Sequence, residues 1–233
     1  MVKEVIPGVS AVKRTRGSNV YLVDGDPAAL IDAGFPLDAG RVMNQLRKNH
    51  KSQPNLLVAT HYHIDHVGSV RTLKEALGAT VAAHEADADV MEGKVPYQRF
   101  KVDALRTIYY SALAPLFRYE NVLVETRLSE GDVLGSLGGL EVIHVPGHTA
   151  GSIMLYQAKR GILFSGDTLR NEKGVLQGPP PEFSPGIDEA FWHIKKKILN
   201  LDFETLLPGH GAAVLGNARA KIEQMMKSVG RLE

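Results

Sequence analysis

The segment 60–68 constrains this chain more than any other, because it places three imidazoles and a carboxylate within six residues. An apolar run ends directly before it, so the segment is expected to follow a buried strand. In extended backbone, residues i and i+2 point to the same side, and His61 and His63 can therefore bind one metal ion. Asp65 and His66 follow where the chain turns, and we expect them to point towards a second metal ion. Imidazole and carboxylate ligands suit zinc, and also iron or manganese.

Three further short apolar runs end in a glycine-containing turn that carries a histidine or an aspartate. Residues 140–145 lead into His148, residues 162–165 into Asp167, and residues 205–207 into His210. Ligands gather at the carboxyl ends of strands, where loops vary without disturbing the core. Glycine beside each candidate lets the backbone turn sharply and approach a ligand closely. Together with the dense motif, these turns predict that all of these residues belong to one metal centre.

The composition of the chain limits the kinds of partner that it is expected to bind. A formal net charge of +1 gives no electrostatic basis for binding nucleic acid or a membrane surface. The absence of cysteine excludes disulfides, thiolate ligands and a thiol nucleophile. The N-terminus has no apolar signal region, and no run is long enough to span a bilayer. We therefore expect a cytoplasmic protein that acts on a small-molecule substrate.

The pattern of apolar runs predicts an α/β fold of one domain over residues 1–233. Strands are expected at 2–6, 9–13, 19–23, 28–31, 56–60, 80–83, 122–126, 127–133, 140–145, 152–157, 162–165 and 205–207. Helices are expected at 37–49, 67–77, from 84 onward, from 185 to 198, and at 217–229. Residues 135–139 are expected to form a hairpin turn, because no helix follows them. The order of strands and helices favours two packed sheets with helices outside them.

Residues 93–120 differ from the rest, because aromatic residues are concentrated there and apolar residues recur at helical spacing. We interpret them as an inserted amphipathic helical segment, which either packs plainly on the sheet or forms a substrate lid or a homodimer contact. Tyr109 in this segment and Arg170 are candidate substrate-binding residues. Arg170 would pair with a substrate carboxylate, although an ordinary surface charge explains it equally well. The proline-rich loop 178–185 would form another wall of the substrate site.

The remaining histidines are interpreted as structural. His84 is expected to start a helix and His50 to end one. His144 is expected in a strand that faces the sheet interior or an edge, and His193 on the polar side of its helix.

Taken together, the motifs HYHIDH at 61–66, PGHT at 146–149, SGDT at 165–168 and PGHG at 208–211 resemble those of the metallo-β-lactamase superfamily of metallohydrolases. The resemblance covers nearly the whole chain and implies a four-layer αβ/βα sandwich of two mixed sheets. It implies a first metal ion on His61, His63 and His148. It implies a second on Asp65, His66 and His210, with Asp167 bridging both. Asp32 resembles an aspartate that braces the metal loop in this family.

The resemblance also implies the chemistry. Two divalent metal ions, with zinc favoured over iron or manganese, lower the pKa of bound water, so that a bridging hydroxide attacks the substrate. The metals hold the oxyanion that develops after attack, and Asp65 is a candidate relay of the proton to the leaving group. The expected substrate is a small ester, thioester or lactone, as in the glyoxalase II and lactonase branches.

Differences between this sequence and individual branches of the superfamily guide the choice of substrate class. True β-lactamases lack an aspartate at the position of Asp167, and flavodiiron proteins carry a glutamate at that of His63. Glyoxalase II enzymes add a C-terminal region that binds glutathione, whereas 23 residues (211–233) follow His210 here. Lactonases carry a tyrosine shortly after the bridging aspartate, where this chain has Leu169 and Arg170. The tRNA-processing nucleases carry a basic RNA-binding arm that this chain lacks.

Two alternatives stay open. Persulfide dioxygenases of the same superfamily hold one iron on the residues that correspond to His61, His148 and Asp167. A member that has lost catalysis and binds a partner is disfavoured, because the full ligand set is present. Metal analysis and oxygen uptake would separate hydrolysis from oxidation.

Overall fold

The computed structural model describes residues 2–48, 53–97 and 120–232. Its first sheet has seven strands in the order β1-β2-β3-β4-β5-β6-β7. The first four strands are antiparallel, whereas β4, β5, β6 and β7 run parallel to one another. The strands are β1 (Lys3–Ile6), β2 (Val9–Ala11), β3 (Tyr21–Val23), β4 (Ala29–Ile31), β5 (Leu56–Val58), β6 (Thr80–His84) and β7 (Thr126–Leu128).

The second sheet has six strands in the order β15-β14-β11-β10-β9-β8. Only β11 and β14 in it are parallel neighbours. Its strands are β8 (Val133–Leu134), β9 (Leu140–His144), β10 (Ile153–Gln157), β11 (Ile162–Gly166), β14 (Thr205–Pro208) and β15 (Val214–Leu215). A separate hairpin is formed by β12 (Arg170–Glu172) and β13 (Val175–Gln177).

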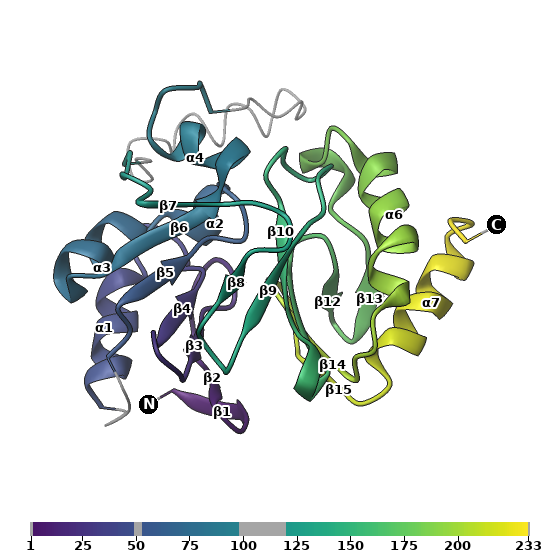
Figure 1. The fold of residues 1–233 in the computed structure, drawn as a ribbon, viewed down its shortest axis with the longest axis horizontal. Helices are drawn as coiled ribbons and strands as arrows, with labels where there is room; N and C mark the ends of the chain where they lie inside the picture. The colour runs from purple at the N-terminus through teal and green to yellow at the C-terminus, as the bar shows by residue number, and fades with distance from the viewer. Residues whose placement is uncertain (1, 49–52, 98–119, 233) are drawn as a thin grey trace.

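Helices lie outside both sheets (Figure 1). On the first sheet they are α1 (Ala39–Arg47), α2 (Ile64–Val67), α3 (Val70–Leu77) and α4 (Glu85–Met91), and on the second α6 (Ile187–Lys196) and α7 (Ala218–Ser228). Short 3-10 turns occupy η2 (Ala158–Arg160), η3 (Pro181–Phe183) and η4 (Ile198–Asn200). No helix in the described ranges is both long and apolar enough to cross a membrane.

Alternation along the strands creates three apolar layers. In β3 and β4, Leu22 and Leu30 pack with the helices of the first sheet. Their neighbours Tyr21 and Ile31 face the second sheet instead, where they meet Phe164. A third cluster joins the outer face of the second sheet to α6 and α7. Because successive side chains of a strand point to opposite faces, short apolar strands can build both layers at once. The predicted αβ/βα sandwich is confirmed.

Several element boundaries differ from the predictions. The helix expected at 67–77 is divided, and its first part, α2, already begins at Ile64 inside the His/Asp motif. The strand expected at 122–126 begins only at Thr126, as β7, because Val122 N donates to Met91 O and Val124 N donates to the Glu92 carboxylate at the end of α4. The strand expected at 127–133 is interrupted by a turn between β7 and β8.

Other connections agree with expectation or add to it. The hairpin turn predicted at 135–139 is confirmed, since it joins the antiparallel strands β8 and β9. The β12–β13 hairpin and β15 were not predicted, because each pairs two or three residues of mixed character. Residues 98–119, with Tyr109 and most of the predicted insertion, lie outside the described residues, as does His50.

Candidate metal centre

The seven predicted ligands meet at one edge of the sandwich. Strands β4 and β5 are parallel, so Asp32 and the loop of His61 emerge at the same end of the first sheet. Strands β11 and β14 are also parallel, so Asp167 and His210 emerge together from the second. A hydrogen bond of 2.9 Å from Ile153 N to Thr60 O joins the two sheets at this edge. Strand direction thus gathers ligands at one end of each sheet, and the contact between the sheets brings the two groups together.

The first cluster consists of His61, His63 and His148. One ring nitrogen of each lies within 4.8 Å of the others. All three are buried, with exposed fractions of 1%, 5% and 1%. The Nε2 atoms of His61 and His148 are only 3.1 Å apart. This spacing and burial match the first metal site that the family resemblance implies.

The neighbours of these rings determine where their protons lie. The Thr60 hydroxyl is 3.0 Å from Asp32 Oδ2 and donates to it, because a carboxylate only accepts. The Thr60 oxygen is then the acceptor for His61 Nδ1–H, at 3.1 Å. In the same way Ser184 Oγ donates to Pro180 O, and accepts from His148 Nδ1–H at 2.8 Å.

With their protons on Nδ1, His61 and His148 turn Nε2 lone pairs towards each other. Two lone pairs at 3.1 Å repel each other, and a cation between them removes that repulsion. The hydrogen bond on the far nitrogen also fixes the tautomer that a metal ligand requires. The donor set therefore fits a divalent cation.

The second cluster consists of Asp65, His66 and His210, again with ligand atoms within 4.8 Å. Asp167 lies between the two clusters. Its Oδ1 is 3.1 Å from His66 Nε2 and 3.3 Å from His210 Nε2, while its Oδ2 faces His148 Nε2 at 3.7 Å. Each carboxylate oxygen of Asp167 thus faces a different cluster, which is the arrangement expected of a bridging ligand.

Asp32 braces the motif as predicted. Its Oδ1 accepts from Thr60 N at 2.9 Å, and its Oδ2 accepts from His66 Nδ1 at 2.8 Å. It is buried and holds a positive φ of 59°, which aspartate tolerates better than most residues. The bond to Nδ1 directs His66 Nε2 towards Asp167.

The electrostatics of the two clusters differ. Burial, with His66 and His148 as close neighbours, holds the pKa of His61 well below its usual range. Burial likewise lowers the pKa of His148 to about 4. Burial acts in the same direction on His66, but the carboxylates of Asp167 and Asp32 outweigh it and raise its pKa well above 6.5. The first cluster therefore offers neutral nitrogens at neutral pH.

At His210, burial is outweighed by hydrogen bonds with Asp167 and Asp65, and its pKa rises to about 9. Burial of Asp167 is in turn outweighed by His66, and its pKa lies well below the usual range. Imidazolium protons here neutralise two carboxylates. A divalent cation would displace those protons and take over the same role.

Sequence reasoning missed the residues that hold the His210 turn. Asn19 Nδ2 donates to Pro208 O at 2.9 Å and to Gly211 O at 2.8 Å. The buried Tyr21 hydroxyl also donates to Pro208 O, at 2.9 Å. Both residues lie in or beside an apolar strand. In the sequence, a single polar group at such a position looks like an ordinary residue at a strand edge. Pairing partners almost 190 residues away leave no local signal.

The glycine predicted to allow close approach does so at position 209. A Cβ there would lie 2.7 Å from Asp167 Oδ1 and 2.7 Å from His66 Cε1. Atoms this close would overlap, so only glycine lets the turn before His210 lie against the ligands.

The other candidates lie differently. Arg170 is only 12% exposed in its side chain, so it is not an ordinary surface charge. Its guanidinium donates to Gly178 O and interacts with Glu172 and Gln177 of its own hairpin. These contacts favour a structural role, and a contact between Arg170 and substrate stays a prediction.

His84 starts α4 as predicted, accepting from Ala86 N at 3.2 Å. Its ring stacks on His144 with centroids 3.9 Å apart. Neither belongs to the clusters of potential metal ligands found in the described residues. His193, half-buried on α6, is not part of them either.

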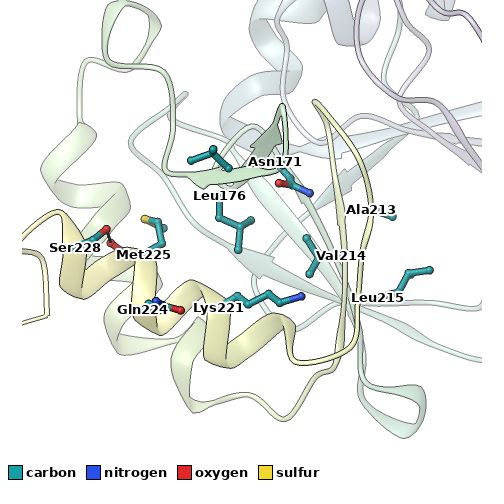
Figure 2. A pocket seen from close by; sticks show the side chains of 11 residues that line it. Asn171, Leu176, Ala213, Val214, Leu215, Lys221, Gln224, Met225 and Ser228 are labelled. Carbon is teal, nitrogen blue, oxygen red and sulfur yellow. Dashed lines mark hydrogen bonds between the residues drawn. The ribbon is translucent and has the colours of Figure 1, made fainter.

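A cavity of about 520 Å³ lies away from the ligands, between the β12–β13 hairpin, β15 and α7. Figure 2 shows Leu176, Val214 and Met225 on its apolar side, with Lys221 and Gln224 on the helix. None of the seven predicted ligands lines it. It is therefore a feature separate from the metal centre.

The sequence matches the profile of the Metallo-beta-lactamase superfamily over residues 14–210. It is 29% identical over 244 residues to the probable metallo-hydrolase YflN of Bacillus subtilis, covering 94% of this chain and 92% of that protein. It is 32% identical over 209 residues to the acyl-coenzyme A thioesterase MBLAC2 of Homo sapiens, covering 83% and 72%. Hydroxyacylglutathione hydrolase of Cereibacter sphaeroides is 32% identical over 184 residues, covering 78% of this chain and 57% of that enzyme.

Solved structures agree on the fold. A metallo-β-lactamase of Cronobacter sakazakii with a HARLDQ motif superimposes with a TM-score of 0.70 at 19% identity, covering 99% of this chain and 93% of that one. TTHA1623, in a di-iron-bound form, superimposes with a TM-score of 0.64 at 28% identity, covering 85% and 89%. Since the profile match runs through every ligand turn to His210, and those turns converge in the αβ/βα sandwich, this chain belongs to the metallo-β-lactamase superfamily of metal-dependent hydrolases.

Proposed function

We propose that this chain is a dinuclear metallohydrolase that cleaves a small ester, thioester or lactone. The observation that carries the proposal is the convergence of seven ligand side chains in two clusters, with one oxygen of Asp167 facing each cluster. A single iron, as in the persulfide dioxygenases, would need only His61, His148 and Asp167. The full set favours two cations.

The ligand assignment follows from the clusters. His61, His63 and His148 would hold the first cation, and Asp65, His66 and His210 the second, with Asp167 shared between them. Bound there, divalent cations would lower the pKa of water from about 16 towards about 7 and would polarise the carbonyl oxygen of the substrate. Histidine and carboxylate ligands favour zinc, while TTHA1623, which binds two irons, supports iron as the alternative.

Asp65 is the residue we assign to proton transfer. Its side chain is 31% exposed, unlike the buried Asp167, so it can reach a substrate that enters from solvent. Burial opposes its ionisation, but His66 and His210 prevail and lower its pKa, which keeps it ionised at neutral pH. It can accept the proton of the attacking water and pass it to the departing alkoxide or thiolate. Water adds across the acyl bond, giving an acid and an alcohol or thiol.

The class of bond is supported by the relatives. Two of them, at 32% identity, are named as an acyl-coenzyme A thioesterase and a hydroxyacylglutathione hydrolase. A thioester carbonyl is an electrophile of the kind this centre would activate. We therefore rank thioesters first and esters and lactones next.

The proposal is tested by metal analysis together with a substrate panel. Protein purified without added metal is analysed for zinc, iron and manganese, and then assayed with acyl thioesters, aryl esters, lactones and phosphodiesters. We expect two metal ions per chain and turnover of an acyl substrate that His61→Ala abolishes. A single iron, with oxygen uptake from a persulfide, would refute hydrolysis in favour of dioxygenase chemistry. An inactive wild-type chain that retains no metal would refute enzymatic function altogether.

A further inference from the structure

The first turn of α4 contacts both loops that carry the first cluster of ligands. Asp87 in this turn is fully buried. Its Oδ2 accepts from Tyr62 N at 3.0 Å and from Thr149 Oγ1 at 2.7 Å. Its Oδ1 accepts from Gly151 N at 2.7 Å. One carboxylate thus connects the loop after β5 to the loop after β9.

These contacts lie beside the ligands in the sequence. Tyr62 stands between His61 and His63, and Thr149 directly follows His148. Because each ligand ring is attached to the backbone that Asp87 holds, a shift of either loop would move ring nitrogens apart. The three rings come from two different sheets, so their spacing depends on a connection between the loops. Ligands need placement to within about 0.5 Å for a metal site to keep its affinity.

The contact is built for a carboxylate. Its three partners are all donors, and a carboxylate is a pure acceptor with lone pairs for each of them. An amide of the same shape would turn an NH₂ group towards at least one donor. The backbone of Gly151 also lies so close that a Cβ there would be 2.6 Å from both Cγ and Oδ1 of Asp87. Glycine at 151 and aspartate at 87 are therefore matched to each other.

A second contact from the same turn supports the arrangement. His84, at the start of α4, stacks on His144 at the end of β9, with ring planes inclined by 14°. His144 Nε2 is 2.8 Å from Ala150 O in the loop that Asp87 holds. The first turn of α4 is thus fixed against β9 independently of the carboxylate, so the backbone that carries Asp87 has a defined position.

We propose that Asp87 is a positioning residue for the first metal site, holding His61, His63 and His148 at their ligand spacing. It complements Asp32, which orients His66 of the second site directly and His61 of the first site through the Thr60 hydroxyl. The proposal rests on the proposed function, since it concerns the same metal centre. It assigns Asp87 no contact with substrate or metal.

The test measures metal binding site by site. Asp87→Asn is loaded with Zn²⁺ alone, and its affinity is measured by competition with a chromogenic chelator. Nitrogen NMR signals of His63 report the first site, and those of His210 report the second. We expect the first-site dissociation constant to rise about 10–100-fold, the usual effect of losing a ligand-orienting group, with the second site unchanged. Turnover is recorded separately.

Gln45→Ala is the matched control, since buried Gln45 makes two hydrogen bonds to the backbone of Lys13, far from the ligands. We expect it to lose stability without changing either zinc affinity. Thr149→Val, which removes one donor to Asp87 and keeps the side-chain shape, serves if Asp87→Asn does not fold. It should weaken the first site about tenfold.

The outcomes separate the two proposals. Folded Asp87→Asn with both wild-type zinc affinities would overturn the role of Asp87 and leave the metallohydrolase proposal intact. An equal loss at both sites, or the same loss in Gln45→Ala, would show a general structural role and overturn it as well. A wild-type chain that binds no metal would overturn both proposals.

Discussion

Replacing Asp32 by asparagine tests how the second metal site is prepared. Asparagine tolerates a φ of 59° as well as aspartate does, so the backbone is not strained by the change. Its amide can still accept from Thr60, but then its NH₂ group faces His66 Nδ1, which now donates to the carboxylate at 2.8 Å. To relieve two facing donors, His66 must move its proton to Nε2, which removes the lone pair aimed at the metal.

The magnitude follows from that single contact. Loss of a hydrogen bond that orients a histidine ligand weakens metal binding about 10–100-fold, or about 1.4–2.7 kcal/mol. A buried donor left unsatisfied costs a further 1–3 kcal/mol, roughly, in the free energy of unfolding of chelated protein. Zinc competition gives the first quantity and urea denaturation in chelator gives the second.

The control and the refuting result are equally specific. Gln45→Ala should lower the free energy of unfolding while both zinc dissociation constants stay at wild-type values. If Asp32→Asn keeps the wild-type affinity at the site that His210 reports, the bond to His66 Nδ1 does not set the tautomer. The account of the second site would then be wrong.

Five further predictions concern the metal centre and the turn that carries His210. Removing metal with a chelator should lower Tm by roughly 5–10 °C for each site held at 100 times its dissociation constant, equivalent to about 2.7 kcal/mol, and an unchanged Tm in calorimetry would exclude tight binding. In chelated protein, the low pKa of His148 predicts that its contribution to stability is complete above pH 6.5 and that about 3 kcal/mol is lost as the pH falls towards 4. The raised pKa of His210 predicts stabilisation that is complete below pH 6.5 and lost as the pH rises to about 9; urea titrations across this range show both limbs, and a flat profile contradicts them. Gly209→Ala should weaken second-site zinc binding about 100-fold, because the added Cβ would overlap Asp167, and wild-type metal content by mass spectrometry would contradict this. Tyr21→Phe should cost about 1 kcal/mol in urea denaturation by removing one buried hydrogen bond, and no loss would show that water replaces the hydroxyl.

Predictions from local sequence patterns were most reliable where the residue types within one segment determine its structure or chemistry. The motif at 61–66 predicted metal ligands because no apolar packing role explains three imidazoles together. The short strands were found because each is an apolar run between turn residues, as in β3 and β4. The predicted ends of strands were less reliable where hydrogen bonds to residues outside the segment determine them. Residues 122–124 have strand-like side chains, yet their backbone bonds go to the end of α4.

In the candidate site, too, some residues could be recognised from local sequence and others could not. All seven candidate ligands could be named from the sequence, because their residue types and glycine-flanked turns are themselves the signal, and the structure brings them together. Asp87 and Tyr21 were not recognised, because an aspartate in a helix and a tyrosine in a strand are ordinary in isolation. Arg170 seemed available to a substrate until its hairpin partners were seen.

The sequence by itself determined the ligand types, the two-sheet architecture and the likeness to a family of metallohydrolases. The ligand chemistry follows from the types of side chain present. The periodicity of two or 3.6 residues that indicates strands and helices depends only on neighbours within a turn or a strand. Only the tertiary structure decided which nitrogen of each ring faces inward, and which buried carboxylates hold the ligand loops. The two carboxylates, Asp32 and Asp87, act through hydrogen bonds between residues 25 to 64 positions apart, and no local pattern records a contact at that distance.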